Sequence, residues 1–463
     1  MTDRTIALVE DGAAPAARAR PRWVRAALAG FLAFELLAAG FLVTAGRPDR
    51  PATTAPQPRR DATRSKADSV EREARERKRA VAAVLDVRAR AIRTRDRNAF
   101  AGTLDPTQVA FVTRQVAMFD AIRKVPLASW RYDLSDDRDF TQESSYLRKY
   151  RGEAWAPRAV LRYQLEGFDD APTAAEQFFT FVRRDGRWLT ASDDDFPDVS
   201  DRQTARDLWD FGPVEVATGA RSLVLGHPGH AALLRDIARQ TDAAVPRVTA
   251  VWGTAWARRA VVVVPRTQRE LAAILGDSTD LSKIAAVAVA ELPGDATGSH
   301  PVGNRVIVNP DNFRRLGTNG RRVVLTHEVT HVASRDSSGA DVPTWLVEGL
   351  ADYVGYLGTG LSAKAICQEL AVEVRNGRRP TALPTDSDFS GRNDRLAQAY
   401  EGAWLAVRMI ADRIGERGLV AFYRAVGAAS GKDRLREPLA ASLHLTPQAF
   451  TTAWRSYVVE QLA

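Results

Sequence analysis

The hydrophobic pattern near the N-terminus predicts a membrane segment followed by a spacer. Residues 26–46 are almost continuously apolar, with Glu35 as the one charge, and about 21 residues of helix can cross a hydrocarbon layer of ~30 Å. Residues 1–25 would then form a cytoplasmic tail. Residues 47–69 are rich in Pro, Thr, Ala and Arg and predict a disordered, extended linker. A cleaved secretory signal ending near Ala45 is the alternative interpretation.

Residues 70–200 change from helical to strand-like periodicity. Val81, Val84 and Ile92 recur at helix spacing, and later segments alternate aromatic and β-branched residues with polar ones. The Asp-Gly pair at 185–186 is typical of a tight hairpin. This order of helices before a curved antiparallel sheet resembles the cone-shaped fold of the nuclear-transport-factor-two-like superfamily. We expect an α+β domain here with a structural or accessory role.

Residues 220–463 predict a second α+β unit, in which a small sheet precedes several helices. Short apolar runs bounded by Gly, Pro or polar residues indicate buried strands. They are separated by segments with helical periodicity. The predicted strands lie at residues 222–227, 260–265, 284–292 and 304–310.

Composition narrows the possible chemistry. A length of 463 residues favours more than one folding unit. The net charge of +8 comes largely from basic residues at 59–79, which have no interleaved aromatic residues, so we expect no nucleic-acid binding. Cys367 is the only cysteine, which excludes an intramolecular disulfide and a thiolate metal cluster. Any bound metal must therefore use histidine and carboxylate ligands.

The stretch VVLTHEVTHVASRD, residues 323–336, carries a metal-binding pattern. His327 and His331 are four residues apart, so on a helix they project from one face about 6 Å apart and can share a Zn²⁺ ion. Glu328 lies about 100° around the helix. It is better placed to act as a general base on a water molecule than as a ligand.

A second stretch, PTWLVEGLADYVG at residues 343–355, supplies a candidate third ligand. Glu348 would complete a His₂Glu set that leaves one zinc position open for water. Asp352 lies one turn further along the same face, where it can accept a hydrogen bond from a ligand histidine, with His327 the favoured partner. Gly349 and Gly355 would allow close helix contacts.

Together these two stretches resemble the gluzincin clan of thermolysin-like and aminopeptidase-like metallopeptidases, and more narrowly the bacterial peptidase MA-like proteins. The resemblance covers roughly residues 220–463. It implies a gluzincin fold, a zinc cofactor and peptide hydrolysis. The 16 residues between His331 and Glu348 are somewhat fewer than in thermolysin-like relatives, so the connecting loop must be compact.

Two further roles are implied by the resemblance alone. Relatives bind the substrate backbone along an edge strand before the first active-site helix, and Asn304, Val306 and Val308 occupy that place. Relatives also use a Tyr or His from a later helix to stabilise the oxyanion, for which Tyr400 is the candidate. The alternative for Tyr400 is simple packing against Trp404 at the i+4 position.

The sequence therefore predicts a membrane-anchored zinc metallopeptidase with a peptide or protein substrate. Its expected place is the cell membrane, as a single-pass protein with the catalytic domain extracytoplasmic. Basic residues flank both ends of residues 26–46, so this orientation follows from the short N-terminal tail and not from charge. The alternative is a non-catalytic, envelope-associated binding protein that retains the fold. A structural zinc site is disfavoured because such sites normally have four protein ligands.

Overall fold

The computed structural model describes residues 59–135, 140–141, 144–199, 202–276, 283–291, 301–338, 342–431 and 433–463. The predicted tail and membrane segment at 1–46 lie outside them, as does most of the linker. Across the described ranges, no helix combines the length and the apolar character needed to cross a bilayer. The first helix, α1 (Arg59–Thr94), begins inside the predicted linker, so residues 59–69 are helical and not extended. They are rich in Arg, Ala and Lys, which favour helix and lengthen α1.

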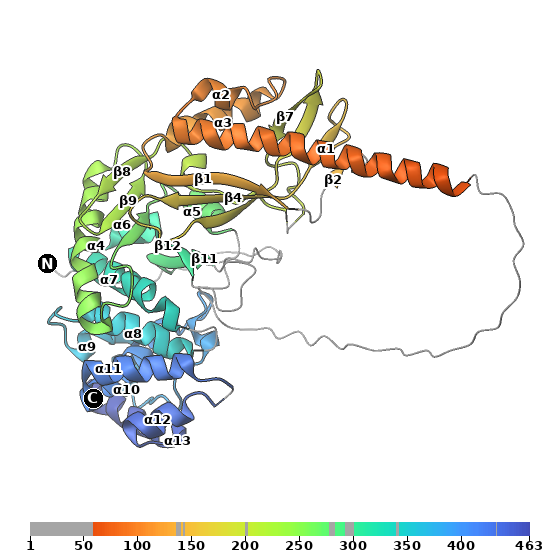
Figure 1. Ribbon diagram of the computed structural model, residues 1–463. Helices are drawn as coiled ribbons and strands as arrows, with labels where there is room; N and C mark the ends of the chain where they lie inside the picture. Colours follow the sequence, from red (N-terminus) through yellow and green to blue (C-terminus); the bar gives the residue numbers. More distant parts are fainter. Residues whose placement is uncertain are drawn as a thin grey trace, which may run out of the picture.

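An N-terminal unit with two antiparallel sheets lies at one end of the molecule (Figure 1). Helix α1 packs along β1 of a three-stranded sheet ordered β1-β4-β5. The other sheet has the order β2-β3-β6-β7. The elements are α2 (Arg97–Ala101), α3 (Val109–Ile122), β1 (Leu127–Leu134), β2 (Phe140–Thr141), β3 (Ala154–Ala156), β4 (Ala159–Leu165), β5 (Thr173–Gln177), β6 (Thr180–Arg184) and β7 (Arg187–Ser192).

The predicted hairpin is present between β6 and β7. Asp185 and Gly186 have φ angles of 49° and 77°. Positive φ at both central positions matches the twist of the flanking strands, and glycine adopts it without a steric penalty.

A five-stranded sheet forms the middle of the molecule, with the order β11-β12-β10-β9-β8. Strands β9, β10 and β12 are parallel, and β8 and β11 pair antiparallel at the two ends. The strands are β8 (Glu215–Thr218), β9 (Ser222–Gly226), β10 (Ala260–Val263), β11 (Ala286–Glu291) and β12 (Val302–Val308); α4 (Ala231–Trp252) and α5 (Gln268–Leu275) connect them, and η2 (Leu208–Asp210) precedes them.

The two faces of this sheet have different partners because side chains alternate along each strand. Leu223, Val261 and Ile307 join a hydrophobic cluster with the N-terminal unit. Val224 and Val306 join a separate cluster with helices on the other side. The sheet is therefore covered on both faces, and the core of the N-terminal unit continues into it.

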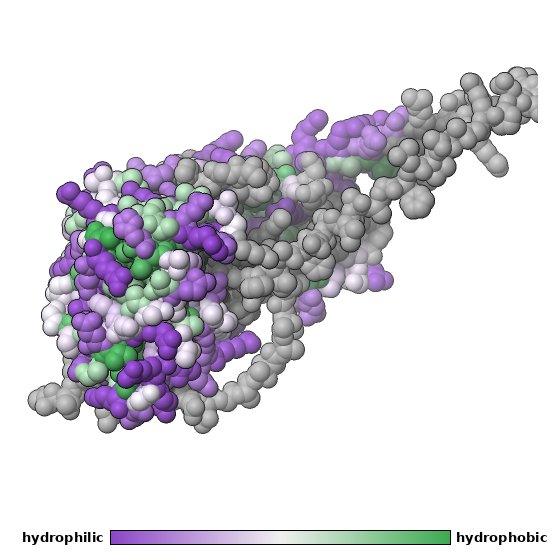
Figure 2. Space-filling model, turned by 90° about the horizontal axis from the view of Figure 1, so that it is seen from below, coloured by the Kyte–Doolittle hydropathy of each residue, from purple (hydrophilic) through white to green (hydrophobic). Residues whose placement is uncertain are grey.

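Helices form the rest of the molecule, and α8 to α13 lie below the sheet in Figure 1. They are α6 (Pro310–Arg315), α7 (Thr318–Ser334), η3 (Arg335–Ser337), α8 (Thr344–Tyr356), α9 (Ala363–Ile366), α10 (Gln368–Arg375), η4 (Asp386–Phe389), α11 (Leu396–Ala428), α12 (Arg436–Leu443) and α13 (Pro447–Leu462). Helix α8 packs between α7 and α11. Seen from below, hydrophobic side chains form small areas separated by hydrophilic ones (Figure 2). The predicted α+β class is confirmed.

The glycines of α8 permit this packing, as expected. A Cβ at Gly349 would lie 2.5 Å from the backbone oxygen of Ala403 in α11. A Cβ at Gly355 would lie 3.2 Å from the backbone oxygen of Val323 in α7. The close approach at Gly349 fixes the position of the neighbouring residue, Glu348.

Candidate metal centre

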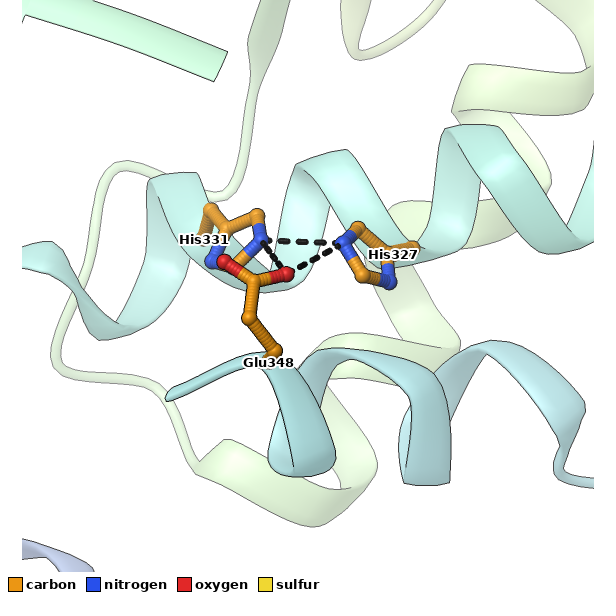
Figure 3. Close-up of side chains that lie close together, drawn as sticks. All are labelled: His327, His331 and Glu348. Carbon is orange, nitrogen blue, oxygen red and sulfur yellow. Dashed lines mark hydrogen bonds and ion pairs between the residues drawn. The ribbon is translucent and has the colours of Figure 1, made fainter. Parts of the chain in front are cut away.

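Two helices carry the predicted ligands and bring them together. His327 and His331 project from one face of α7, and Glu348 projects towards them from α8 (Figure 3). The side chains of these three residues are 13–16% exposed. The site is thus largely enclosed but keeps some access to solvent.

The ligand atoms form a small triangle. Nε2 of His327 lies 3.0 Å from Nε2 of His331. Oε2 of Glu348 lies 3.3 Å from Nε2 of His327 and 3.5 Å from Nε2 of His331. Among the described residues, this His-His-Glu set is the group whose spacing could hold a metal ion.

The size of the triangle can be compared with zinc chemistry. Ligand atoms about 2.0–2.1 Å from a tetrahedral zinc are separated from one another by about 3.3 Å. The three observed separations lie close to that value, so the three side chains fit Zn²⁺ with little movement. Three protein ligands leave a fourth position for water or substrate, as in catalytic zinc sites.

Asp352 makes the contact that the sequence predicts. Its Oδ1 lies 2.8 Å from Nδ1 of His327. An Nδ1–H donated to this carboxylate leaves Nε2 of His327 free as a metal ligand. Burial lowers the pKa of His327, but the carboxylates of Asp352, Glu348 and Glu328 together outweigh burial and raise that pKa well above its usual value. Burial would raise the pKa of Glu348, yet the two histidines hold it far below normal.

Glu328 lies beside the ligand set and is only 5% exposed. Burial raises the pKa of its carboxyl group, and the two histidines and a hydrogen bond from the backbone N–H of Ala288 partly oppose that rise. A carboxylate with a raised pKa close to a metal position can accept a proton from water. Glu328 therefore has the environment of a general base.

Tyr400 reaches the same site from α11. Its ring centroid lies 6.4 Å from that of His327, and the Glu348 carboxylate is close enough to raise the pKa of its hydroxyl. Burial, followed by the charges of Glu348 and Asp352, raises the pKa of Tyr400 well above normal. The hydroxyl thus stays protonated and able to donate. The ring also packs on Phe389, with centroids 5.2 Å apart, rather than simply on Trp404.

The predicted substrate strand is not at the edge of the sheet. Residues 304–308 belong to β12, which pairs with β11 and, at Val306 and Ile307, with β10. The expectation that Asn304, Val306 and Val308 offer a free backbone edge is therefore wrong. The outer strand on this side is β11. Both strands are short, apolar and rich in valine or alanine, so hydropathy alone does not tell which one is outermost.

The structure adds two groups that the sequence analysis missed. The backbone oxygen of Ala288 in β11 accepts a hydrogen bond from Nη2 of Arg335, at 2.9 Å, and the backbone N–H of Ala288 acts on the carboxyl group of Glu328 and lowers its pKa. Arg335 follows His331 by four residues, the interval that separates the two histidines. That spacing was a signal available in the sequence.

Comparisons with known proteins give little further information. No protein-family model matches the chain, and no curated protein matches it. Solved structures with some similarity include a two-domain M1 zinc metallopeptidase mutant bound to L-arginine, at 14% identity and a TM-score of 0.30. An M1 zinc metallopeptidase mutant from Deinococcus radiodurans has 15% identity and a TM-score of 0.33. A two-domain M1 zinc metallopeptidase mutant bound to L-tryptophan has 14% identity and a TM-score of 0.29.

The alignments are partial. They cover 61%, 73% and 72% of this chain and 60%, 73% and 71% of the three structures, in the same order. The chain thus spans 60% of the length of the first of them. Because the TM-scores are this low, these similarities support no function for this chain. A functional assignment depends on the geometry of the site. The likeness of residues 70–200 to the nuclear-transport-factor-two-like superfamily has no support from these comparisons and stays a prediction.

Proposed function

We propose that this protein is a zinc-dependent metallopeptidase in which His327, His331 and Glu348 hold the metal. The observation that carries the proposal is the ligand triangle, with separations of 3.0, 3.3 and 3.5 Å. Its size suits tetrahedral zinc, and its three-residue composition leaves a position open. The carboxylate of Glu328 beside it is a group that a purely structural metal site does not need.

Each remaining side chain has a role in the proposed reaction. Zinc supplies a Lewis acid that polarises the substrate carbonyl and lowers the pKa of a water molecule. Glu328 accepts the proton of the attacking water and passes it to the leaving amine. The Tyr400 hydroxyl donates a hydrogen bond to the negative oxygen that develops on the carbonyl carbon. Asp352 fixes the tautomer and orientation of His327.

The substrate backbone is assigned to β11 in place of β12. At Ala288 its peptide oxygen accepts a hydrogen bond from Arg335, and its peptide N–H lowers the pKa of Glu328. An extended peptide added beside this strand would pass next to the general base.

We also propose the single-pass membrane anchor at residues 26–46 and an extracytoplasmic catalytic domain, on the basis of hydropathy and the short N-terminal tail.

Substitution of the general base tests the proposal. The Glu328→Gln variant should retain zinc, because Glu328 is not a ligand, and should lose about 10²–10⁴-fold in peptide hydrolysis. Zinc content and hydrolysis of a fluorogenic peptide library should be measured on both proteins. Equal hydrolysis by the two proteins would remove Glu328 from the mechanism. Zinc binding without hydrolysis by either protein would favour the non-catalytic binding protein.

A further inference from the structure

The residue Arg335 extends the row of metal ligands. Helix α7 ends at Ser334, and Arg335 continues with helical backbone angles of φ −54° and ψ −43°. His327, His331 and Arg335 are therefore spaced at four-residue intervals along one face. The guanidinium group follows the metal ligands towards the outer strand β11.

Among the described residues, this guanidinium makes one hydrogen bond. Nη2 donates to the oxygen of Ala288, at 2.9 Å. Nε is buried and has no hydrogen-bond partner among the residues that the structure describes. Within the described ranges, no carboxylate forms an ion pair with Arg335, although Glu328 and Asp336 act on it electrostatically at longer range. Arg335 thus brings a positive charge into the site without a direct counter-ion.

A partly buried cation of this kind costs free energy unless an anion approaches it. Burial lowers the pKa of Arg335 to about 10, so the group remains positively charged at neutral pH. The bond to Ala288 alone would need only a neutral donor. The planar guanidinium instead offers paired N–H groups that match the two oxygens of a carboxylate.

We propose that Arg335 binds a carboxylate of the substrate beside the scissile bond and so gives the enzyme a preference for peptides with a negative charge at that place. The inference rests on the proposed peptidase function and adds a substrate class to it. The carboxylate has two chemical sources, the C-terminus of a peptide or an Asp or Glu side chain. A terminal carboxylate would make the enzyme trim chain ends, whereas a side-chain carboxylate would select internal acidic sites.

The test uses full-length protein and a dansylated heptapeptide of fixed neutral sequence. One pair of peptides compares the C-terminal acid with the amide, and further pairs compare Glu with Gln at each position. Binding is measured by fluorescence to zinc-loaded Glu328→Gln protein, in which hydrolysis does not interfere. We expect one charged peptide to bind about 10–100-fold more tightly than its neutral partner. The pair that shows this difference identifies the source of the carboxylate.

The same binding titrations on variants of Arg335, each made in the Glu328→Gln protein, decide whether Arg335 binds the carboxylate. Arg335→Gln keeps a donor for Ala288 and should reduce the charge preference to near unity. Arg335→Lys keeps the charge but loses the paired donors, so it should retain only part of the preference. Arg315→Gln removes an exposed arginine from α6 and should keep the full preference. If circular dichroism finds Arg335→Gln unfolded, the comparison of Arg335→Lys with the parent decides.

Two results would overturn the inference in distinguishable ways. Peptide hydrolysis by the unsubstituted protein, together with no charge preference or one that survives Arg335→Gln and Arg335→Lys, would remove the role of Arg335 and leave the peptidase proposal standing. A protein that neither holds zinc nor hydrolyses any peptide would refute the proposed function, and the role of Arg335 would fall with it.

Discussion

At the scale of single residues, the candidate metal site combines a histidine pair on one helix with carboxylates from the next helix, α8. The four-residue spacing of His327 and His331 follows from helix geometry and needs no tertiary information. The meeting with Glu348 depends on how α8 packs against α7, which spacing alone does not determine. The 2.8 Å contact between His327 and Asp352 has the same origin. The spacing of Arg335 was visible in the sequence, but its contact with Ala288 of β11 was not, because that strand is far away along the chain.

The first prediction concerns the carboxylate behind the ligand histidine. Asp352→Asn should weaken zinc binding by about 10–100-fold, because the amide orients His327 less firmly and no longer increases its basicity. Competition with a fluorescent zinc chelator measures the affinity. Asp394→Asn removes a fully exposed carboxylate and serves as the control, with unchanged affinity expected. Equal affinities for all three proteins would show that Asp352 does not support the metal site.

The second prediction concerns pH and two carboxyl groups of the segment before the five-stranded sheet. Burial raises the pKa of Asp207 to about 6 and that of Asp210 to about 7, from 3.8. Between pH 3.8 and these raised pKa values, the two carboxyl groups therefore keep their protons in the folded state and have released them in the unfolded state. Their contribution to stability is complete below pH 3.8 and is lost as the pH rises through about 6 to 7.

Asp210→Asn removes one of these titrations. Its oxygen can still accept the hydrogen bond from the backbone N–H of Asp207. Between pH 5 and pH 8, the free energy of unfolding should fall less in the variant than in the parent, by on the order of 1–2 kcal/mol after allowance for solvent screening. Urea unfolding at both pH values measures the difference. An identical pH dependence in the two proteins would contradict the raised pKa of Asp210.

At the scale of elements, strong patterns were predicted well and strand order was not. The hairpin at Asp185-Gly186 and the motif helices are present because local conformation determines them. The exchange of β12 for β11 as the outer strand has a topological cause. The chain leaves β10, adds β11 at the outside and returns to place β12 between the two. Hydropathy gives no information on that return.

The third prediction tests the contact between α8 and α11. Gly349→Ala would bring a Cβ to 2.5 Å from the oxygen of Ala403 and 2.7 Å from Val407. The backbones must separate, so we expect a loss of about 1–3 kcal/mol in the free energy of unfolding. Glu348 should move with α8 and weaken zinc binding. Urea unfolding and zinc competition measure the two effects.

A matched alanine substitution separates this clash from a general effect of losing glycine. Gly317→Ala lies at the start of α7, has a negative φ and no other atom within 4 Å of its Cβ. It should cost less stability than Gly349→Ala and leave zinc affinity unchanged. Comparable losses in the two variants would contradict the packing explanation.

At the scale of the whole molecule, the predicted division into two α+β units needs refinement. Hydrophobic residues of the N-terminal unit and one face of the five-stranded sheet form a continuous cluster. Arg305 on β12 also makes two hydrogen bonds to Asp169, at 2.6 and 2.8 Å, and both side chains are at least 91% buried. Sequence patterns separate units by composition, but they do not reveal a core that crosses the boundary.

The fourth prediction tests this connection. Asp169→Asn leaves the Arg305 guanidinium buried without its counter-charge, which should cost about 3–5 kcal/mol in the free energy of unfolding. Arg75→Gln breaks an exposed pair with Glu71 and should cost under ~0.5 kcal/mol. Urea unfolding followed by tryptophan fluorescence measures both. Similar small losses would indicate that the two units are held together without the buried pair.

Zinc K-edge X-ray absorption on the metal-loaded protein shows whether two histidines and one glutamate hold a catalytic zinc ion. We expect one zinc per chain with two imidazole ligands and oxygen ligands at about 2.0–2.1 Å, and loss of one oxygen contribution or of the metal in Glu348→Ala. A zinc spectrum without imidazole scattering, or one unchanged in Glu348→Ala, would contradict this expectation.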